Sequence, residues 1–378
     1  MKKAEALTSR RHAGKAGRAP VAGEVQHRGI TVFKNLEYPF YRTSQTSSLV
    51  RHIFAMTEVK RYKIKEPWLD IHCGLGEGPH WDVSRNTLRF VDIVNKKVHQ
   101  VDLAKGPSSL KTFDVKECVT VSADIEGNDK QFVYGGKFGY GIMHKDTGEV
   151  RNLQLFWTDA EREDDGGGKP GKGRNLEERM RSNDGAVDRN GRFWVGTMND
   201  DAVVGSNFTD EGVLFRLDSD LSLHRVRENV TIPNGTTWSN DDKTIYFTDS
   251  PTSKINAYPY NSETGEVSWA EGKTHFQVEG GVPDGHCQDE EGHLWVAGHG
   301  TGKVFRVDPQ GQVVAEVELP TRCVTCPTLC GTELFITTMG ETEPEKHPES
   351  LKYQGAVFKV EVGVRGQPLN KFKMPESV

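Results

Sequence analysis

The chain has 378 residues and a formal net charge of −6, from 48 basic and 54 acidic side chains. This charge argues against nucleic acid as a partner, because phosphate binding needs a basic face. No run of about 18 apolar residues occurs, so the sequence predicts no membrane partner. The six Cys are irregularly spaced, which in a long chain is typical of reduced thiols rather than a disulfide framework.

The N-terminal part of the chain differs from the rest. Residues 1–31 hold seven Lys and Arg against two Glu, without apolar periodicity. We expect residues 1–66 to form a disordered extension. A mitochondrial presequence has a similar composition and is the alternative, and a natural start at Met56 is a third interpretation. Because no secretory signal is present, a cytoplasmic location is expected.

Four later segments share one pattern, which begins with an acidic or amide residue and reaches a polar residue five positions later. A Gly, Asn or Asp turn and an aromatic-rich strand follow. The segments are Glu77–Asp82, Asn183–Asp188, Asn234–Ser239 and Asp284–Asp289. The last three start 51 and 50 residues apart, and Asn183 follows Glu77 by 106 residues, about two periods. The chain therefore contains a repeat of about 50 residues.

Two further units complete the repeat. One lies near 118–150, with a turn at 127–129, and the other at 322–362, with a strand at 334–338. Additional strands with period-2 alternation are expected at 97–102, 212–217, 254–258, 302–307 and 355–360. Short strands at this period are propeller-sized. We predict an all-β, six-bladed β-propeller with four-stranded antiparallel blades around a central channel, spanning 67–365 and followed by a tail at 366–378.

Other folds explain the pattern less well. A pair of β-sandwiches does not account for one register that recurs four times. Helix is expected only as a turn at 176–181.

Equivalent positions of propeller blades lie at the same height around the channel. Glu77, Asn183, Asn234 and Asp284 should therefore meet at one end of it. Carboxylate and amide oxygens suit Ca²⁺ or Mg²⁺ and tolerate Mn²⁺ or Zn²⁺. Three protein ligands would leave coordination positions for water or substrate. The alternative is that these residues only cap turns, but Glu77 is not a turn former.

At these residues the sequence resembles the family of regucalcin (senescence marker protein), gluconolactonase and luciferin-regenerating enzyme. The resemblance covers roughly residues 68–365. Its motifs are Gly76-Glu-Gly-Pro-His-Trp81, Arg181-Ser-Asn-Asp-Gly185, Gly196-Thr-Met198, Pro233-Asn-Gly235, Pro283-Asp-Gly-His-Cys287 and Leu294-Trp-Val296. The chain departs from animal members in its extended N-terminus and in a Gly/Lys-rich loop, Asp164–Arg174.

The resemblance implies a six-bladed propeller that holds one divalent metal and hydrolyses a lactone, typically a sugar lactone. By position it implies metal ligands at Glu77, Asn234 and Asp284.

For the substrate, the resemblance implies contacts from Arg181 and Asn183 and a further acidic contact at Asp201. The register alone leaves open whether Asn183 contacts the metal or only the substrate.

In the expected mechanism the metal acts as a Lewis acid, Asp284 is the candidate general base, and water activated by the metal is the alternative. Arg181 and Asn183 would orient a sugar ring. The expected partner is a small lactone, and the protein a monomer or weak dimer. Competing interpretations are a non-enzymatic calcium-binding regulator, a propeller scaffold for protein partners, and a metal-free propeller of the alkaloid-synthase type.

A Cys-X-X-Cys motif, Cys323 to Cys326, has no fourth ligand at zinc-binding spacing and no βαβ context. We expect these to be incidental thiols in strands.

Overall fold

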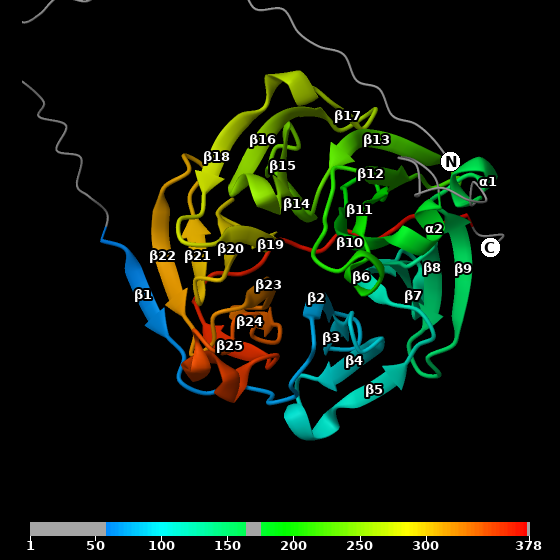
Figure 1. Cartoon of the computed structure of the whole chain (residues 1–378). Coiled ribbons are helices and arrows are strands. Elements are labelled where there is room, and N and C mark those ends of the chain that lie inside the picture. The colour runs from blue at the N-terminus through cyan, green and yellow to red at the C-terminus, as the bar shows by residue number, and fades with distance from the viewer. Residues whose placement is uncertain (1–57, 164–174, 376–378) are drawn as a thin grey trace, which may run out of the picture. The chain divides into compact units, whose positions relative to one another are not determined.

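The computed structural model describes residues 58–163 and 175–375. Within these ranges the strands form six sheets in a ring around a central channel (Figure 1). The predicted six-bladed β-propeller is therefore confirmed. Most of the expected N-terminal extension and the loop Asp164–Arg174 lie outside the described residues. Among the described residues, no helix has the length and apolar character needed to cross a membrane.

The blades follow one another along the chain, and the first strand of each lies innermost (Figure 1). Blade 1 consists of β2 (Gly76–Asp82), β3 (Thr87–Asp92), β4 (Lys97–Asp102) and β5 (Lys111–Asp114). Blade 2 consists of β6 (Val119–Ile125), β7 (Asn128–Gly136), β8 (Gly139–His144) and β9 (Val150–Leu155). Blade 3 consists of β10 (Met180–Val187), β11 (Phe193–Asn199), β12 (Gly212–Leu217) and β13 (Leu223–Val230).

Blade 4 consists of β14 (Pro233–Trp238), β15 (Thr244–Asp249), β16 (Lys254–Asn261), the short β17 (Glu266–Val267) and β18 (Lys273–Gln277). Blade 5 consists of β19 (Val282–Gln288), β20 (Leu294–His299), β21 (Lys303–Val307) and β22 (Val313–Glu318), and blade 6 of β23 (Val324–Cys330), β24 (Glu333–Thr338) and β25 (Phe358–Glu361). The helices in the described ranges are short: α1 (Asp159–Arg162), α2 (Leu176–Arg179), α3 (Asp201–Val204), and 3-10 segments at Pro107–Ser109, Ser250–Thr252, Trp269–Glu271 and Pro348–Tyr353.

In two blades, the polar residue five positions after the start of the repeat accepts a hydrogen bond from a Trp of the second strand. The indole Nε1 of Trp194 donates to Asp188 Oδ2 at 2.9 Å. Trp295 donates in the same way to Asp289 Oδ2 at 3.0 Å. Both indoles are almost completely buried, and a buried indole N–H needs an acceptor. The Asp-to-aromatic spacing seen in the sequence is thus a structural device of the blade.

The N-terminal segment closes the ring on its outer side. The predicted extension ended at residue 66, yet β1 (Lys60–Lys63) pairs in parallel with β22 as a fifth strand of blade 5. The boundary is therefore corrected to before Lys60, because the edge strand β22 offers unpaired backbone groups that β1 satisfies. Blade 6 has three strands of its own, and Leu69 bridges to Val357 at its outer edge.

The predicted C-terminal tail packs across the far end of the channel. It appears in red behind the innermost strands in Figure 1. Gln367 N donates to Gln288 O, and Phe372 N donates to Asp124 O at 2.8 Å. The side chain of Phe372 is completely buried in the core shared by blades 2 and 3. The tail thus links blade 5 to blade 2 and covers one mouth of the channel.

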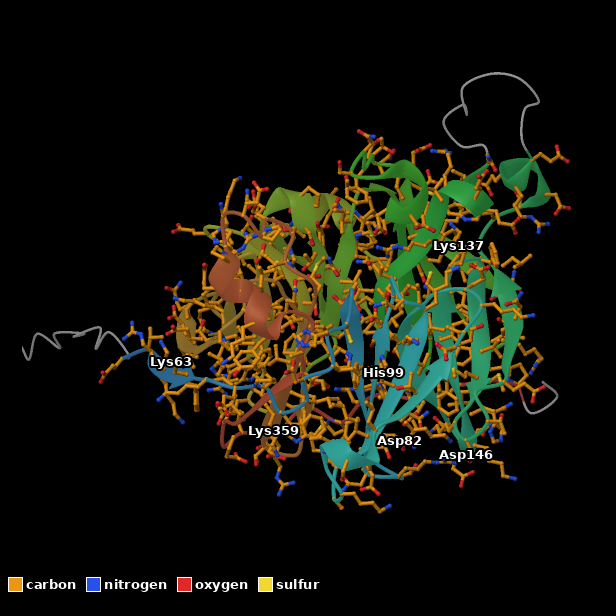
Figure 2. All side chains as sticks on the ribbon, turned by 60° about the horizontal axis from the view of Figure 1, so that its bottom comes forward. Lys63, Asp82, His99, Lys137, Asp146 and Lys359 are labelled. Carbon is orange, nitrogen blue, oxygen red and sulfur yellow. The ribbon has the colours of Figure 1, made fainter. Side chains whose placement is uncertain are left out.

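Figure 2 shows the opposite ends of the blades, with Lys137 near one end and Asp82 near the other. Asp82 closes the innermost strand β2, and Lys137 lies in the turn between β7 and β8. The innermost strands therefore begin at the Lys137 end. This end carries the residues that the sequence repeat brought together.

Candidate metal centre at the channel mouth

All six innermost strands carry a β-bulge at the same height. The register with the second strand shifts between Glu77/His80, Val119/Val121, Ser182/Gly185, Asn234/Thr236, Pro283/His286 and Val324/Pro327. A bulge leaves a residue unpaired and re-aims its side chain. The four predicted positions, Glu77, Asn183, Asn234 and Asp284, all lie at these bulges.

The glycines beside these residues let neighbouring innermost strands approach closely. A Cβ atom on Gly235 would lie 2.0 Å from Nδ1 of His286, and one on Gly285 would lie 2.4 Å from Sγ of Cys326. Gly78 has a positive φ of 53°, which favours glycine. The Asn-Gly and Asp-Gly pairs of the repeat therefore reflect tight packing around the channel.

A continuous hydrogen-bond network joins four of the predicted residues. Arg181 donates through Nε and Nη2 to Asp201 Oδ1, both at 3.2 Å, and through Nη1 to Asn183 Oδ1 at 2.9 Å. Asn183 Nδ2 in turn donates to Asn234 Oδ1 at 3.1 Å. Asn234 Nδ2 donates to Ser250 Oγ at 2.8 Å. The repeat predicted Asn183 and Asn234 at one end of the channel, and the family resemblance added Arg181 and Asp201. Ser250 carried no signal that revealed it.

Three carboxylates form the charged part of the same centre. Burial raises the pKa of Glu77 well above its usual value, and the negative charges of Asp284 and Asp184 raise it further. Burial and the charge of Asp184 likewise raise the pKa of Asp284. Burial raises the pKa of Asp184 to about 6. The three carboxylates are therefore close enough to repel one another in a poorly hydrated place.

Sequence reasoning missed Asp184. It took one residue from each blade, whereas the bulge between Ser182 and Gly185 places two consecutive residues outside the regular pairing. As a result, the side chain of Asn183 joins the amide network, and the side chain of Asp184 lies near the carboxylates of Glu77 and Asp284. The acidic residue in the Asn-Asp-Gly motif was the available signal.

The donor set fits a hard divalent cation. Arg181 lowers the pKa of Glu77, but its guanidinium is already paired with Asp201. The centre thus gathers more negative charge than it neutralises, and buried charges normally pair or coordinate metals. The side-chain nitrogen of Asn234 points toward Ser250. Its side-chain oxygen, Oδ1, therefore faces Asn183. The roles of Glu77, Asn234 and Asp284 as ligands remain a prediction.

The histidines around the channel differ in their surroundings. Burial lowers the pKa of His286 to about 3, and its Nε2 lies 3.0 Å from Thr237 Oγ1. Such an imidazole is a neutral packing residue. His299 instead lies near the carboxylates, with its Nδ1 3.7 Å from Asp284 Oδ2. That separation is too long for a direct hydrogen bond.

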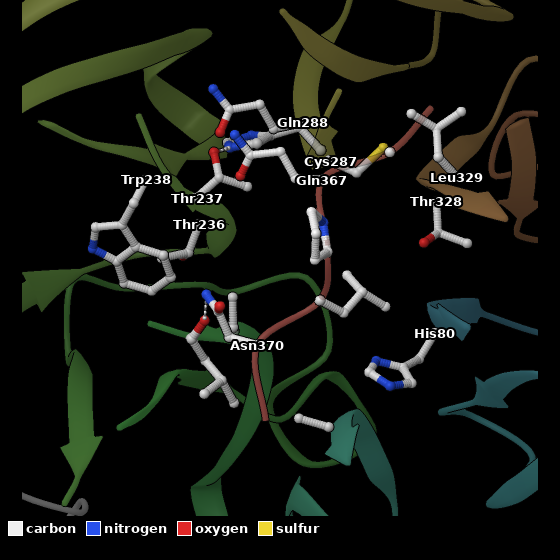
Figure 3. A pocket seen from close by; sticks show the side chains of 18 of the residues that line it. His80, Thr236, Thr237, Trp238, Cys287, Gln288, Thr328, Leu329, Gln367 and Asn370 are labelled. Carbon is white, nitrogen blue, oxygen red and sulfur yellow. Dashed lines mark hydrogen bonds between the residues drawn. The ribbon is translucent and has the colours of Figure 1, made fainter. Parts of the chain in front are cut away.

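Two cavities include residues of this region, and neither lining includes Glu77, Asn234 or Asp284. The channel cavity, of about 440 Å³, is lined by all six innermost strands and by residues 366–370 of the tail, and includes Asp184. Figure 3 shows His80, Gln288 and Asn370 around it. The mouth cavity, of about 580 Å³, contains Arg181 and Asp201 together with residues of α2 and α3. Arg181 and Asp201 therefore border a space that can hold a small molecule.

All six cysteines are free, and five of them are buried. This agrees with reduced thiols. Cys326 lies near the centre, since Glu77, Asp184 and Asp284 all raise the pKa of its thiol beyond the effect of burial.

Comparison with known proteins places the chain in a family. Residues 75–340 match the family model described as SMP-30/Gluconolactonase/LRE-like region. The regucalcin of Xenopus laevis is 34% identical over 302 residues, which cover 77% of this chain and 92% of that relative. The putative sugar lactone lactonase of Bacillus subtilis is 28% identical over 305 residues, which cover 79% and 96%.

A solved structure supports the same fold. The regucalcin from Agrobacterium tumefaciens matches with a TM-score of 0.70 and 23% sequence identity, over 83% of this chain and 99% of that one. From the family match over more than half of its length and the similarity to regucalcin, the chain belongs to the SMP-30/Gluconolactonase/LRE-like family.

Proposed function

We propose that this protein hydrolyses lactones at the channel mouth, with a divalent cation held by Glu77, Asn234 and Asp284. The observation that carries the proposal is the cluster of one buried and two partly buried carboxylates of raised pKa beside the amide network. Sugar lactones are the proposed substrate class. The printed name of the Bacillus subtilis relative, a putative sugar lactone lactonase, supports that choice.

The cation, when bound, would supply Lewis-acid chemistry that polarises the lactone carbonyl. Asp284 is the proposed general base and takes a proton from the attacking water at a side-chain oxygen. Its side chain is 14% exposed, so water reaches it while the protein restricts access. Asp284 would be ionised in the cation-bound state, because a neighbouring cation would lower the pKa of its carboxyl.

Substrate orientation falls to the residues bordering the mouth cavity. Arg181 is 4% exposed and Asp201 42% exposed on their side chains. Asp201 is therefore the more accessible of the two side chains, and its carboxylate can accept a hydrogen bond from a sugar hydroxyl. It also holds the Arg181 guanidinium in place. Asn183 adds an amide beside them. We propose that this set orients the ring so that its carbonyl faces the carboxylates.

A lactone panel tests the proposal. Protein treated with EDTA is assayed by pH-stat with aldonolactones and simple lactones, before and after addition of Ca²⁺, Mg²⁺, Mn²⁺ or Zn²⁺. We expect hydrolysis only after addition of one of these cations. Asp284→Ala should abolish it and weaken cation binding measured by calorimetry. Glu290→Gln, at the far end of the channel cavity, is the matched control and should change neither.

Two outcomes would overturn the proposal. One is hydrolysis of every tested lactone at undiminished rate by Asp284→Ala. The other is calcium binding without hydrolysis of any lactone, which is the behaviour of a non-enzymatic calcium-binding regulator.

A further inference from the structure

A second group of possible metal ligands lies away from the channel, where the ring closes. Among the described residues, Cys73, Asp92 and His99 each offer one ligand atom, and these three atoms lie within 4.8 Å of one another. The residues are buried, with exposed fractions of 3%, 2% and 2%. Glu77, Asn234 and Asp284 are not part of this group.

His99 is arranged as a metal ligand would be. Its Nδ1 lies 2.9 Å from Thr112 Oγ1, and its ring stacks on Phe90 at a centroid distance of 4.8 Å. These two contacts fix the ring. The other nitrogen, Nε2, is buried and has no hydrogen-bond partner among the described residues. Metal-ligating histidines typically engage one nitrogen with the protein and leave the other free for the metal.

The carboxylate of Asp92 is held rigidly. It accepts hydrogen bonds from Gly74 N at 2.9 Å, Leu75 N at 3.1 Å, and the side-chain and backbone N–H groups of Asn95. Asp249 holds backbone N–H groups in blade 4 in the same way. Asp92 and Asp249 therefore play the same structural role in their own blades, which is to accept hydrogen bonds from backbone N–H groups. Hydrogen bonds to a ligating carboxylate are also common in metal sites.

Cys73 approaches from a different part of the fold. Its backbone N–H donates to Gly355 O at 2.8 Å, which attaches it to the loop before β25 in blade 6. Asp92 and His99 belong to β3 and β4 of blade 1 (Figure 2 labels His99). An ion bound by all three would thus join the N-terminal segment and blade 6 to blade 1.

We propose that Cys73, Asp92 and His99 form a zinc site that stabilises the closure of the propeller ring. Sulfur, imidazole and carboxylate donors together suit Zn²⁺ better than the oxygen-preferring Ca²⁺ or Mg²⁺. Three protein ligands leave one position for water. As the zinc–sulfur bond forms, the Cys73 thiol releases its proton to solvent. Burial lowers the pKa of His99 to about 4, so the imidazole is neutral at pH 7, as a ligand must be.

The test uses the full chain, freed of metal and titrated with Co²⁺ as a spectroscopic probe and with Zn²⁺ for stoichiometry. A thiolate ligand gives a sulfur-to-cobalt charge-transfer band, which an all-oxygen site lacks. We expect the band in the wild type and in Glu77→Gln. Glu77→Gln, with the channel site weakened, should still retain one Zn²⁺ per chain by elemental analysis.

Cysteine variants identify the ligand. Cys73→Ala should lose the band, about one bound Zn²⁺ per chain and the rise of melting temperature that Zn²⁺ produces. Cys330→Ala, a free buried cysteine in the same core cluster, and Cys326→Ala, beside the channel carboxylates, should keep all three. The proposal is overturned if Glu77→Gln shows no band and binds no zinc, or if the band disappears in Cys326→Ala and persists in Cys73→Ala. Neither result bears on lactone hydrolysis.

Discussion

Asp184→Asn should remove a large part of the pH dependence of stability in the metal-free protein. Burial raises the pKa of Asp184 from 3.8 to about 6, so the folded state binds its proton more tightly than the unfolded state. The resulting stability is fully present below pH 3.8 and is lost as the pH rises through 6. A pKa rise of this size corresponds to about 3 kcal/mol.

Thermal unfolding in EDTA at pH 4 and pH 7 measures the effect. In a chain of this size about 3 kcal/mol corresponds to roughly 6 °C of melting temperature. Because pH 4 already lies slightly above 3.8, about 2.4 kcal/mol of this is lost between pH 4 and pH 7, and the wild type should lose roughly 5 °C relative to Asp184→Asn. Asp129→Asn, at an exposed position near the start of β7, is the control and should follow the wild type. Saturating Ca²⁺ should narrow the difference, because a bound cation offsets the repulsion.

One result would refute this reasoning. If Asp184→Asn and the wild type show the same change of melting temperature between pH 4 and pH 7, the Asp184 carboxylate is hydrated. The centre would then not gather buried negative charge, and the case for a cation there would lose its physical basis.

Three further substitutions test packing around the channel. Lys145 donates to Asp82 at 2.6 Å, and both side chains are 2% exposed. Lys145→Met should therefore lower the free energy of unfolding, measured with urea, by about 3–5 kcal/mol. Adding Asp82→Asn should restore part of that free energy. Gly235→Ala would drive a Cβ to 2.0 Å from His286 Nδ1, so the free energy of unfolding should fall by about 1–3 kcal/mol. Phe372→Ala removes a completely buried ring and should cost about 3–5 kcal/mol by calorimetry; a smaller loss would show that the tail adds little to the core.

The fold was predictable because four blades repeat one chemical pattern at one spacing. In the other two blades, the sequence did not show which residue occupies the repeated position. Thr120 and Thr325 lie at the bulges of β6 and β23, where the other blades carry acidic or amide residues. A threonine in a strand is too ordinary to mark a register. Sequence spacing located these blades, but only the structure aligned them.

The missed features have local physical causes. Asp184 was overlooked because a bulge breaks the strict alternation that assigns one side chain per blade to the channel. The C-terminal tail shows no period-2 pattern, since it is anchored by single contacts such as Phe372 and Asn370 rather than by a ladder. The strand β1 holds three basic residues and one Tyr at an exposed edge, so its composition resembles that of the basic segment before it.

The ring of six equivalent positions also indicates how one site arises from a repeated fold. Thr325 Oγ1 donates to Gly76 O at 2.6 Å, and Thr120 Oγ1 lies 2.7 Å from Ser182 Oγ. Both hydroxyls are engaged with a neighbouring innermost strand, so blades 2 and 6 tie the channel wall together. Charged and amide groups at this height come from the remaining four blades. A propeller can thus concentrate charge at one mouth without losing closure, because the positions that bind one strand to the next are chemically distinct from those that face the centre.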